Sequence, residues 1–490
     1  MKQIIKKETI KEYILRLGIN FGTLLIFWGG MLRKSFTSDT ISHMVASDAD
    51  VQVNMEQGRY LKALVDGLLL KYGLRTTTNI SVTMLLAFIF LALTMLLLQI
   101  IFKRWEPQRL SSRIVFHLIL NLWVCNVLFV ENLMFSEVSI YFALAYFLAT
   151  IGVLCYTKKK YVWMMIMLAV STCAYQYAVV FAAIFVAFYI FLEERKLTWK
   201  VFWREILGVT ICMGMGVLNL ISIWILIKSD AISQFFKSAG VGDMKLKLKQ
   251  VIQSFVQLHK DAAGIFPSLW LPLLMMLVVA VLMILSSIHK KQLSELAFFG
   301  MVIVGSCMLL YVIPLTEEHF YFPPRMSFCF FAIQGVIMAA AYTLISSEKA
   351  KILNICAICY LMLHLLFADF VVTNHFVSNT LDRVYVQMAY QEILKYEEET
   401  DTAVTNLCVC NDINAPAYYS EVHYVSDQIN ERSLGILSVS IMEAVTGRKF
   451  QKAEMNQEVY NTYFAGKNWD YFDLSEQMVI IGDTAYWCVF

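Results

Sequence analysis

Proline and charged residues are scarce in this sequence. It has 7 prolines in 490 residues, and Asp, Glu, Lys and Arg together make up 16% of it, against about a quarter in soluble globular domains. The net charge of +2 says little about partners, and no feature indicates nucleic-acid binding. The sequence has neither a P-loop nor a dinucleotide-binding fingerprint, which argues against a nucleotide-driven enzyme. No His, Cys and Asp cluster has metal-ligand spacing, so we expect neither a cofactor nor a required metal.

Long apolar runs fill the chain instead. Hydrophobic residues make up 59% of it, and its mean hydropathy is +0.61. Many runs approach the roughly 20 residues that a membrane-spanning helix needs, and in lipid a helix satisfies its own backbone groups. We therefore predict an all-α polytopic membrane protein with about 11 transmembrane helices. The predicted spans are 15–32, 79–102, 114–130, 138–156, two short helices within 162–192, 205–227, 267–288, 296–313, 326–345 and 352–372.

The distribution of Lys and Arg predicts the orientation of these spans. Six basic segments fall on one side if the run 162–192 is split at Tyr175-Gln176-Tyr177: the N-terminus, 103–113, 158–160, 193–204, 289–291 and 349–351. Basic short loops stay in the cytoplasm. No small-residue cleavage site follows the basic N-terminus, so it is expected to flank an uncleaved first span. We predict a multi-pass protein of the cell membrane with a cytoplasmic N-terminus and an extracytoplasmic C-terminal domain.

Two domains are expected, a membrane domain of residues 1–372 and a small α/β domain of residues 373–490. In the second, 374–399 and 438–448 are predicted helices, 404–410 is a predicted strand, and 478–490 is a strand pair around Gly482-Asp483. Cys408 and Cys410 would share a strand face. A disulfide from this pair to Cys488 and a reduced, buried set of three cysteines remain open alternatives.

The first predicted outer loop, 33–78, is rich in polar residues for a chain of this composition. It carries Asp39, Asp48 and Asp50, followed by Gly58-Arg59. Arg59 opens an amphipathic helix predicted over 59–72 and expected to lie in the membrane interface. Its apolar face consists of Leu61, Leu64, Val65, Leu68 and Leu69.

These polar groups fit sugar transfer from a polyprenyl phosphate. An acceptor hydroxyl is a weak nucleophile, so a carboxylate beside it helps as general base, and we assign this role to Asp39. The leaving phosphate is best stabilised by arginine, whose guanidinium pairs with phosphate oxygens in a bidentate manner; Arg59 and Arg325 are the candidates. Direct displacement by the acceptor inverts the anomeric centre. Further candidate substrate contacts are Asp48, Asp50, Glu137, Tyr175, Gln176 and His319.

Simpler structural roles compete with each assignment. Asp39 could cap a helix, Arg59 could snorkel at the interface, and Arg325 beside Pro323-Pro324 could anchor a span. Asp48 and Asp50 could be solvated loop acids, and Glu131 and Glu137 could simply keep a loop soluble. Tyr175 and Gln176 could satisfy backbone groups between short helices, and His319 could belong to an interfacial aromatic belt. The basic stretch 244–260 is predicted to be an amphipathic helix on the outer leaflet, near anionic lipid.

The layout of these residues resembles that of a known family. Asp39 follows the first span, Gly58-Arg59 opens an interfacial helix, Tyr175-Gln176 separates two short spans, and Pro324-Arg325 enters a later one. This layout is similar to that of the integral-membrane O-antigen glucosyltransferases that cause serotype conversion, within the GT-C fold class. The resemblance implies a GT-C-like membrane domain and a polyprenyl-phosphate-glucose donor. Members usually carry paired acids in the first loop, whereas Ser38-Asp39-Thr40 supplies one, which leaves open whether Asp48 or Asp50 substitutes for the second.

The predicted enzyme therefore moves a hexose, expected to be glucose, from a polyprenyl-phosphate carrier to a cell-surface glycan or its lipid-linked precursor. Three alternatives remain: a polysaccharide polymerase or ligase, a transporter or flippase for lipid-linked sugars, and a non-catalytic membrane scaffold. A transporter places ionisable residues inside its spans. The predicted spans are nearly free of them, with Glu205 and Asp369 close to span ends, which favours chemistry at the membrane surface.

Overall fold

The structure is a computed structural model in which two compact units can be distinguished. It describes residues 10–45, 49–232, 243–262, 264–266, 268–316, 319–346, 348–411, 429, 434, 438–467 and 472–489. The first unit comprises Met1–Leu32, Ala49–Leu133 and Glu137–Asp369. The second comprises Arg33–Asp48, Met134–Ser136 and Phe370–Phe490. Residues 33–48, which the sequence places in the membrane domain, thus group with the C-terminal residues.

Apolar helices make up the first unit. Among the described residues, 7 helical segments are long and apolar enough to cross a membrane: Ile10–Leu32, Ile80–Trp105, Ser139–Thr157, Trp199–Lys228, Trp270–His289, Pro324–Leu344 and Ala350–Thr400. Shorter apolar helices are α6 (Leu110–Leu120), α9 (Tyr161–Thr172) and α14 (Leu293–Leu309). A multi-helix membrane protein is confirmed, while the number of crossings stays a prediction.

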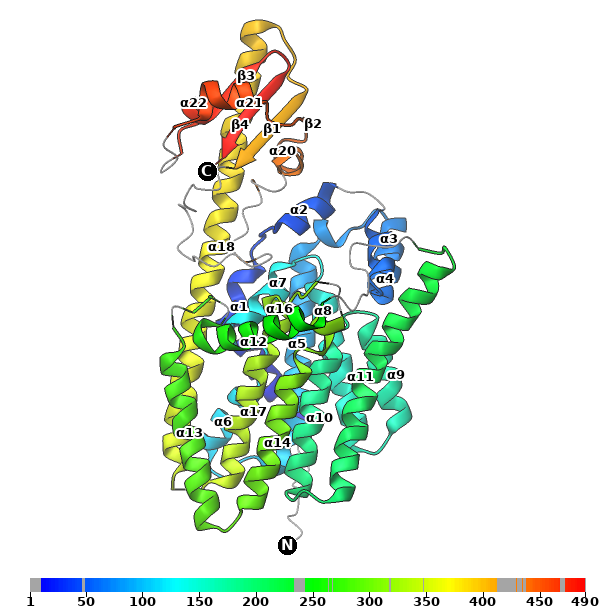
Figure 1. Ribbon diagram of the computed structural model, residues 1–490, viewed down its shortest axis with the longest axis vertical. Helices are drawn as coiled ribbons and strands as arrows, with labels where there is room; N and C mark the ends of the chain where they lie inside the picture. The colour runs from blue at the N-terminus through cyan, green and yellow to red at the C-terminus, as the bar shows by residue number, and fades with distance from the viewer. Residues whose placement is uncertain are drawn as a thin grey trace. The chain divides into compact units, whose positions relative to one another are not determined.

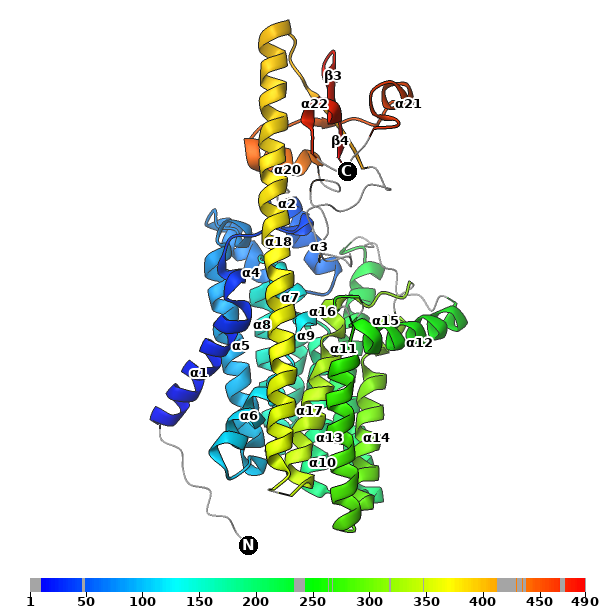
Figure 2. The same ribbon diagram turned by 90° about the vertical axis from the view of Figure 1, so that its left-hand side faces the viewer.

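Helix α10 (Ala178–Glu194) lies at the centre of this unit. Every residue from Ala178 to Leu192 is buried, and α10 packs against α8 (Ser139–Thr157), α9, α11 (Trp199–Lys228), α14 and α17 (Cys329–Leu344). Its alanines allow close helix packing. Figures 1 and 2 show α10, α13 (Trp270–His289), α14 and α17 running side by side, with α12 (Met244–Asp261) lying across them. The helix predicted over 244–260 is therefore confirmed.

The predicted break in the run 162–192 is also confirmed. Helix α9 ends at Thr172 and α10 begins at Ala178, so residues 173–177 form a junction between two short helices. Tyr175 and Gln176 belong to this junction.

The predicted span 114–130 is wrong as a single helix. Helix α6 ends at Leu120, and two short helices follow, Val127–Phe129 and α7 (Val130–Met134). The Asn126 side chain donates to the Leu122 and Trp123 carbonyls, both at 2.8 Å, and accepts from the Phe129 N–H at 3.3 Å. An asparagine that bonds its own backbone in this way competes with a continuing helix.

A continuous helix replaces two predicted segments near the C-terminus. Helix α18 runs from Ala350 to Thr400, whereas the sequence predicts a span that ends at 372 and a separate helix that starts at 374. Residues 350–400 contain neither glycine nor proline, so nothing local stops the helix after its apolar part. Residues up to Asp369 belong to the first unit and those from Phe370 to the second.

The second unit contains a small sheet whose strands follow the order β2-β1-β4-β3. Strand β1 (Asn406–Asn411) pairs in parallel with β2 (Gln451–Lys452) and β4 (Thr484–Val489), and β3 (Met478–Ile481) is antiparallel to β4. Gly482, with φ +60°, forms the turn of the β3–β4 hairpin. The predicted strands at 404–410 and 478–490 are confirmed, as is the helix before Gly447, which is α20 (Ser438–Thr446).

The three cysteines of this unit lie on neighbouring strands. Cys410 of β1 is the register partner of Cys488 of β4, and their Sγ atoms are 3.2 Å apart. Cys408 is buried two residues earlier on β1. Of the two pairings that a disulfide would allow, the strand register brings Cys410 rather than Cys408 to Cys488.

Candidate functional site

A buried ion pair between Arg325 and Glu131 lies at the centre of the candidate site in the first unit. Arg325 is in α16 (Pro324–Ser327), at the start of the segment that α17 continues. Its Nη1 donates to Glu131 Oε1 at 3.1 Å, and its backbone N–H donates to Glu131 Oε2 at 2.6 Å. One carboxylate therefore fixes both the side chain of Arg325 and the first turn of its helix, where backbone N–H groups lack helical partners.

The alternative role of Glu131 and Glu137, that of keeping a loop soluble, is wrong. Glu131 lies in α7 with 0% of its surface exposed, and Glu137 is 1% exposed. Burying an ionised carboxylate is costly unless it is paired, and Arg325 provides the pairing for Glu131. A sequence signal was present, because the apolar run 127–130 directly precedes Glu131, but its partner is 194 residues away in the chain.

Two tyrosines complete the surroundings of Arg325. Its Nη2 donates to the Tyr321 hydroxyl at 2.6 Å, and the guanidinium carbon lies 5.3 Å from the centre of that ring. The Tyr175 hydroxyl donates to the Arg325 carbonyl at 3.2 Å. Burial raises the pKa of Tyr175, while the positive charges of Arg325 and Arg59 oppose that rise in pKa. Both tyrosines therefore act as neutral hydrogen-bonding groups beside Arg325.

A clamped turn carries Arg59 to this place. The Gln176 side chain donates to the Gln57 carbonyl at 2.5 Å and to Asn219 Oδ1 at 3.2 Å, and Asn219 donates to the Gly58 carbonyl at 3.0 Å. Gly58 has φ +72°, and a Cβ there would lie 2.6 Å from Ile223 Cδ1. The turn therefore requires glycine, both for its backbone conformation and for its approach to α11.

The helix after this turn is docked on the same side. In α4 (Tyr60–Lys71), the Leu61 N–H donates to the Cys173 carbonyl at 2.9 Å, and the Tyr60 hydroxyl lies 2.7 Å from the Ser222 hydroxyl. These contacts join residues 57–61 to the α9–α10 junction and to α11. The structure thus brings together four predicted site residues, Arg59, Tyr175, Gln176 and Arg325. It adds Glu131, Tyr321 and Asn219, which the sequence analysis did not assign.

Helix α4 is amphipathic as predicted. Its apolar residues Leu64 and Leu68 are 61% and 48% exposed, in keeping with a face that meets lipid. Its polar residues face inward: Lys62 Nζ donates to Asp66 Oδ2 at 2.6 Å, and the Tyr141 hydroxyl of α8 donates to Asp66 Oδ1 at 2.6 Å. Sequence periodicity identified the apolar stripe, but it did not indicate that the other stripe is buried.

The remaining predicted residues are either not part of this site or fall outside the residues that the structure describes. Asp39 is exposed in the first turn of α2 (Ser38–Val45), in the second unit. Thr37 makes the capping bond of that helix, since its Oγ1 accepts from the Thr40 N–H at 3.1 Å. His319 is exposed. Asp48 is outside the described residues, and Asp50 lies in α3 (Ala49–Glu56) with its side chain outside them.

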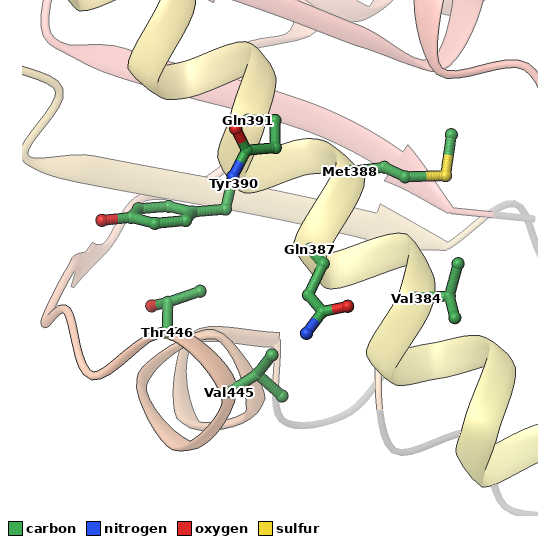
Figure 3. Close-up of a pocket in the computed structure, with 7 residues that line it drawn as sticks. All are labelled: Val384, Gln387, Met388, Tyr390, Gln391, Val445 and Thr446. Atoms are coloured by element: carbon green, nitrogen blue, oxygen red, sulfur yellow. The ribbon is translucent and has the colours of Figure 1, made fainter.

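A groove in the second unit has a different character. Figure 3 shows Gln387 and Tyr390 extending from α18 on the side of Val445 and Thr446 of α20. The groove encloses about 470 Å³, and its described lining consists of uncharged side chains: Val384, Gln387, Met388, Tyr390, Gln391, Val445 and Thr446. A phosphate needs cationic partners, so we do not assign phosphate chemistry to this groove.

The apolar helices define an integral membrane protein, and the arginine–carboxylate site within them gives it a polar centre. The glucosyl transferase GtrII family matches residues 30–336, which include Arg59, Glu131, Tyr175 and Arg325. The chain therefore belongs to this glucosyltransferase family, as its sequence layout predicted. A glucosyltransferase requires a sugar donor and a glycan acceptor. Comparison with curated proteins and with solved structures gave no match.

Proposed function

We propose that this glucosyltransferase takes glucose from a polyprenyl-phosphate carrier and transfers it to a cell-surface glycan or its lipid-linked precursor at the outer membrane face. The observation that carries the proposal is that two arginines lie at the α9–α10 junction within a bundle of apolar helices. Tyr175 bonds the Arg325 carbonyl, and Gln176 holds the turn that leads into Arg59. Such a site suits a donor whose hydrocarbon tail stays in the bilayer while its charged phosphate meets fixed cations.

The chemistry follows from the charge that develops on the donor. The acceptor oxygen forms a bond to the anomeric carbon of glucose, the bond from that carbon to the phosphate oxygen breaks, and the hydroxyl proton passes to a carboxylate base. The phosphate leaves with the bonding electrons and with more negative charge than it had as a diester. Arg59 and Arg325 stabilise that charge in a poorly solvated site, where fixed cations act strongly. Attack opposite to the leaving group inverts the anomeric centre.

Glu131 orients Arg325 in this mechanism. Because it holds both the guanidinium and the backbone N–H of Arg325, the cation is in place before the donor binds. Asp39 is the proposed general base. It belongs to the other compact unit, and the Asp39→Asn variant tests its role separately from those of the arginines.

A transfer assay with purified full-length protein tests the proposal. Labelled polyprenyl-phosphate-glucose and candidate acceptors would be supplied to wild type and to Arg59→Lys, Arg325→Lys and Asp39→Asn. We expect each arginine variant to lose about 10-fold or more in kcat/KM because lysine cannot make the bidentate contact. Arg109→Lys, at an exposed position before α6, is the control and should retain activity.

Three results would contradict parts of the proposal. A wild type that transfers no glucose from this donor would remove the donor assignment. Undiminished transfer by Asp39→Asn would remove Asp39 from the mechanism. We also predict that EDTA leaves the rate unchanged, because arginines supply the positive charge at the phosphate; a loss that Mg²⁺ restores would show that a metal assists.

A further inference from the structure

Lys62 is a buried cation with unused hydrogen-bonding capacity. It is 3% exposed, on the inward face of α4. Its Nζ makes one hydrogen bond among the described residues, to Asp66 Oδ2 at 2.6 Å, and lies 5.7 Å from the centre of the Tyr141 ring. An ammonium group has three donors. Two of them therefore have no acceptor in the part of the chain that the structure describes.

The partners of Lys62 are themselves held in place. Asp66 is 9% exposed, and its second oxygen accepts from the Tyr141 hydroxyl at 2.6 Å. Tyr141 comes from α8, so the Asp66 carboxylate joins two helices and fixes the ammonium group between them. A buried ion pair is seldom better for stability than apolar residues of similar size. A lysine kept in such a place with two unused donors points to a ligand that supplies oxygen acceptors.

Lys62 is linked to the arginine site through two helices. Lys62 lies in the first turn of α4, three residues after Arg59, which is the N-cap residue of that helix. Residue Phe142, next to Tyr141 in the chain, lies with its ring centre 4.4 Å from that of Tyr175. The hydroxyl of Tyr175 in turn contacts the Arg325 carbonyl. The Lys62 group and the Arg59–Arg325 group are thus connected through both α4 and α8.

We propose that Lys62 is a further ligand of the donor's phosphate, with Asp66 and Tyr141 as the residues that position it. The inference rests on the proposed polyprenyl-phosphate donor and adds to it a third cation. The two unused donors of the ammonium group bind phosphate oxygens that the arginines leave exposed. Since Asp66 neutralises part of the charge on Lys62 before the donor arrives, Lys62 contributes directed hydrogen bonds more than net charge.

The test measures donor binding and turnover separately in the full-length protein. Wild type, Lys62→Gln and Tyr141→Phe would be compared for the KM of polyprenyl-phosphate-glucose, the KM of the acceptor, and inhibition by unlabelled polyprenyl phosphate. We expect Lys62→Gln to raise the donor KM and the inhibition constant about 10-fold, as for loss of a charged hydrogen bond, with the acceptor KM unchanged. Tyr141→Phe should move the same two constants by about 3-fold, because it loosens Asp66 without removing the cation.

A matched control lies on the same helix. Lys71 is exposed in the last turn of α4, and Lys71→Gln should leave all three constants unchanged. If a folded Lys62→Gln keeps the wild-type donor KM and inhibition constant, the proposal is overturned. If Lys62→Gln does not fold, Tyr141→Phe decides in its place, and unchanged constants there overturn the proposal as well.

Failure of the donor assignment would give a different result. In that case wild type transfers no glucose from polyprenyl-phosphate-glucose, and direct binding of polyprenyl phosphate becomes the measurement. Weaker binding by Lys62→Gln than by Lys71→Gln would then support Lys62 as a phosphate ligand. Equal binding by the two variants would overturn it.

Discussion

At the scale of single residues, the site is organised by charges that the fold buries in pairs. Glu131 supports Arg325, and Asp66 supports Lys62, in each case with carboxylate oxygens at hydrogen-bond distance. Breaking such a pair from one side is costly because the remaining charge stays buried without compensation. Each ion pair therefore contributes both to the stability of the fold and to the proposed phosphate binding. Suitable variants should separate these two contributions.

Replacing Glu131 provides this separation. Glu131→Gln should lower the free energy of unfolding by about 3 kcal/mol, because Arg325 then keeps a buried charge that its partner no longer balances. Thermal unfolding in detergent measures the loss. The double variant Glu131→Gln with Arg325→Met should recover much of the stability, since both charges are gone, yet it should remain inactive. A double variant as unstable as the single one would show that the charge pair is not the source of the effect.

At the scale of elements, most residues of the site come from short helices and turns rather than from the long helices. The α9–α10 junction supplies Tyr175 and Gln176, α7 supplies Glu131, and the turn before α4 supplies Arg59. The turn is held by Gln176 and Asn219 at its carbonyl groups. Long apolar helices such as α10 and α11 form the scaffold against which these turns pack.

Gly58→Ala tests whether the turn matters for Arg59. A methyl group would lie 2.6 Å from Ile223 Cδ1 and 2.7 Å from Asn219 Oδ1, at a backbone φ of +72°. We expect a cost of about 1–3 kcal/mol in stability from strain at this residue. The KM for the donor should rise as well, because the methyl group displaces the Asn219 side chain. The Gly58 carbonyl then loses the hydrogen bond from Asn219 that fixes the turn before Arg59.

Gly67→Ala is the control for that substitution. Gly67 lies inside α4, where a Cβ would meet Val51 Cγ1 at 4.0 Å, an ordinary contact. Alanine is a better helix former than glycine by up to about 1 kcal/mol, so this variant should be at least as stable as wild type with an unchanged donor KM. If both glycine variants behaved alike, Gly58 would not be required for a left-handed turn.

At the scale of the whole molecule, membership of the glucosyl transferase GtrII family and the apolar helices agree on a membrane enzyme. Orientation is a separate matter that the charge distribution predicts. Basic segments such as 193–204 and 289–291 follow the ends of apolar helices on the predicted cytoplasmic side. This asymmetry predicts a cytoplasmic N-terminus and an extracytoplasmic position for residues 373–490.

A reporter fusion tests this orientation. A reporter enzyme that becomes active only outside the cytoplasm should be active when fused after the C-terminus and inactive when fused to the N-terminus. A fusion after Lys160, in the short turn between α8 and α9, should be inactive as well. Activity at the N-terminus with none at the C-terminus would reverse the topology and place the proposed outer-face chemistry on the wrong side.

Some features of this protein follow from the order of its residues alone. Apolar run length predicts membrane helices because lipid leaves no other partner for the backbone, and local signals such as Gly447 and Gly482 mark turns because few other residues adopt their conformation. The sequence also predicted the helix start at Gly58-Arg59 and the break at Tyr175-Gln176, because both depend on residues that are neighbours in the chain. The sequence therefore predicted the fold class, the family resemblance and four of the residues that meet in the site.

Only the tertiary structure showed which charges meet. Glu131 and Arg325 are 194 residues apart, and Asp66 and Tyr141 are 75 apart, and no local pattern encodes a distant partner. Asn219 is equally inconspicuous within an apolar helix until Gly58 packs against it. Long-range pairing depends on which helix faces come together when the bundle packs. For that reason the sequence could predict the elements and some of the chemistry, whereas the geometry of the site emerged from the fold.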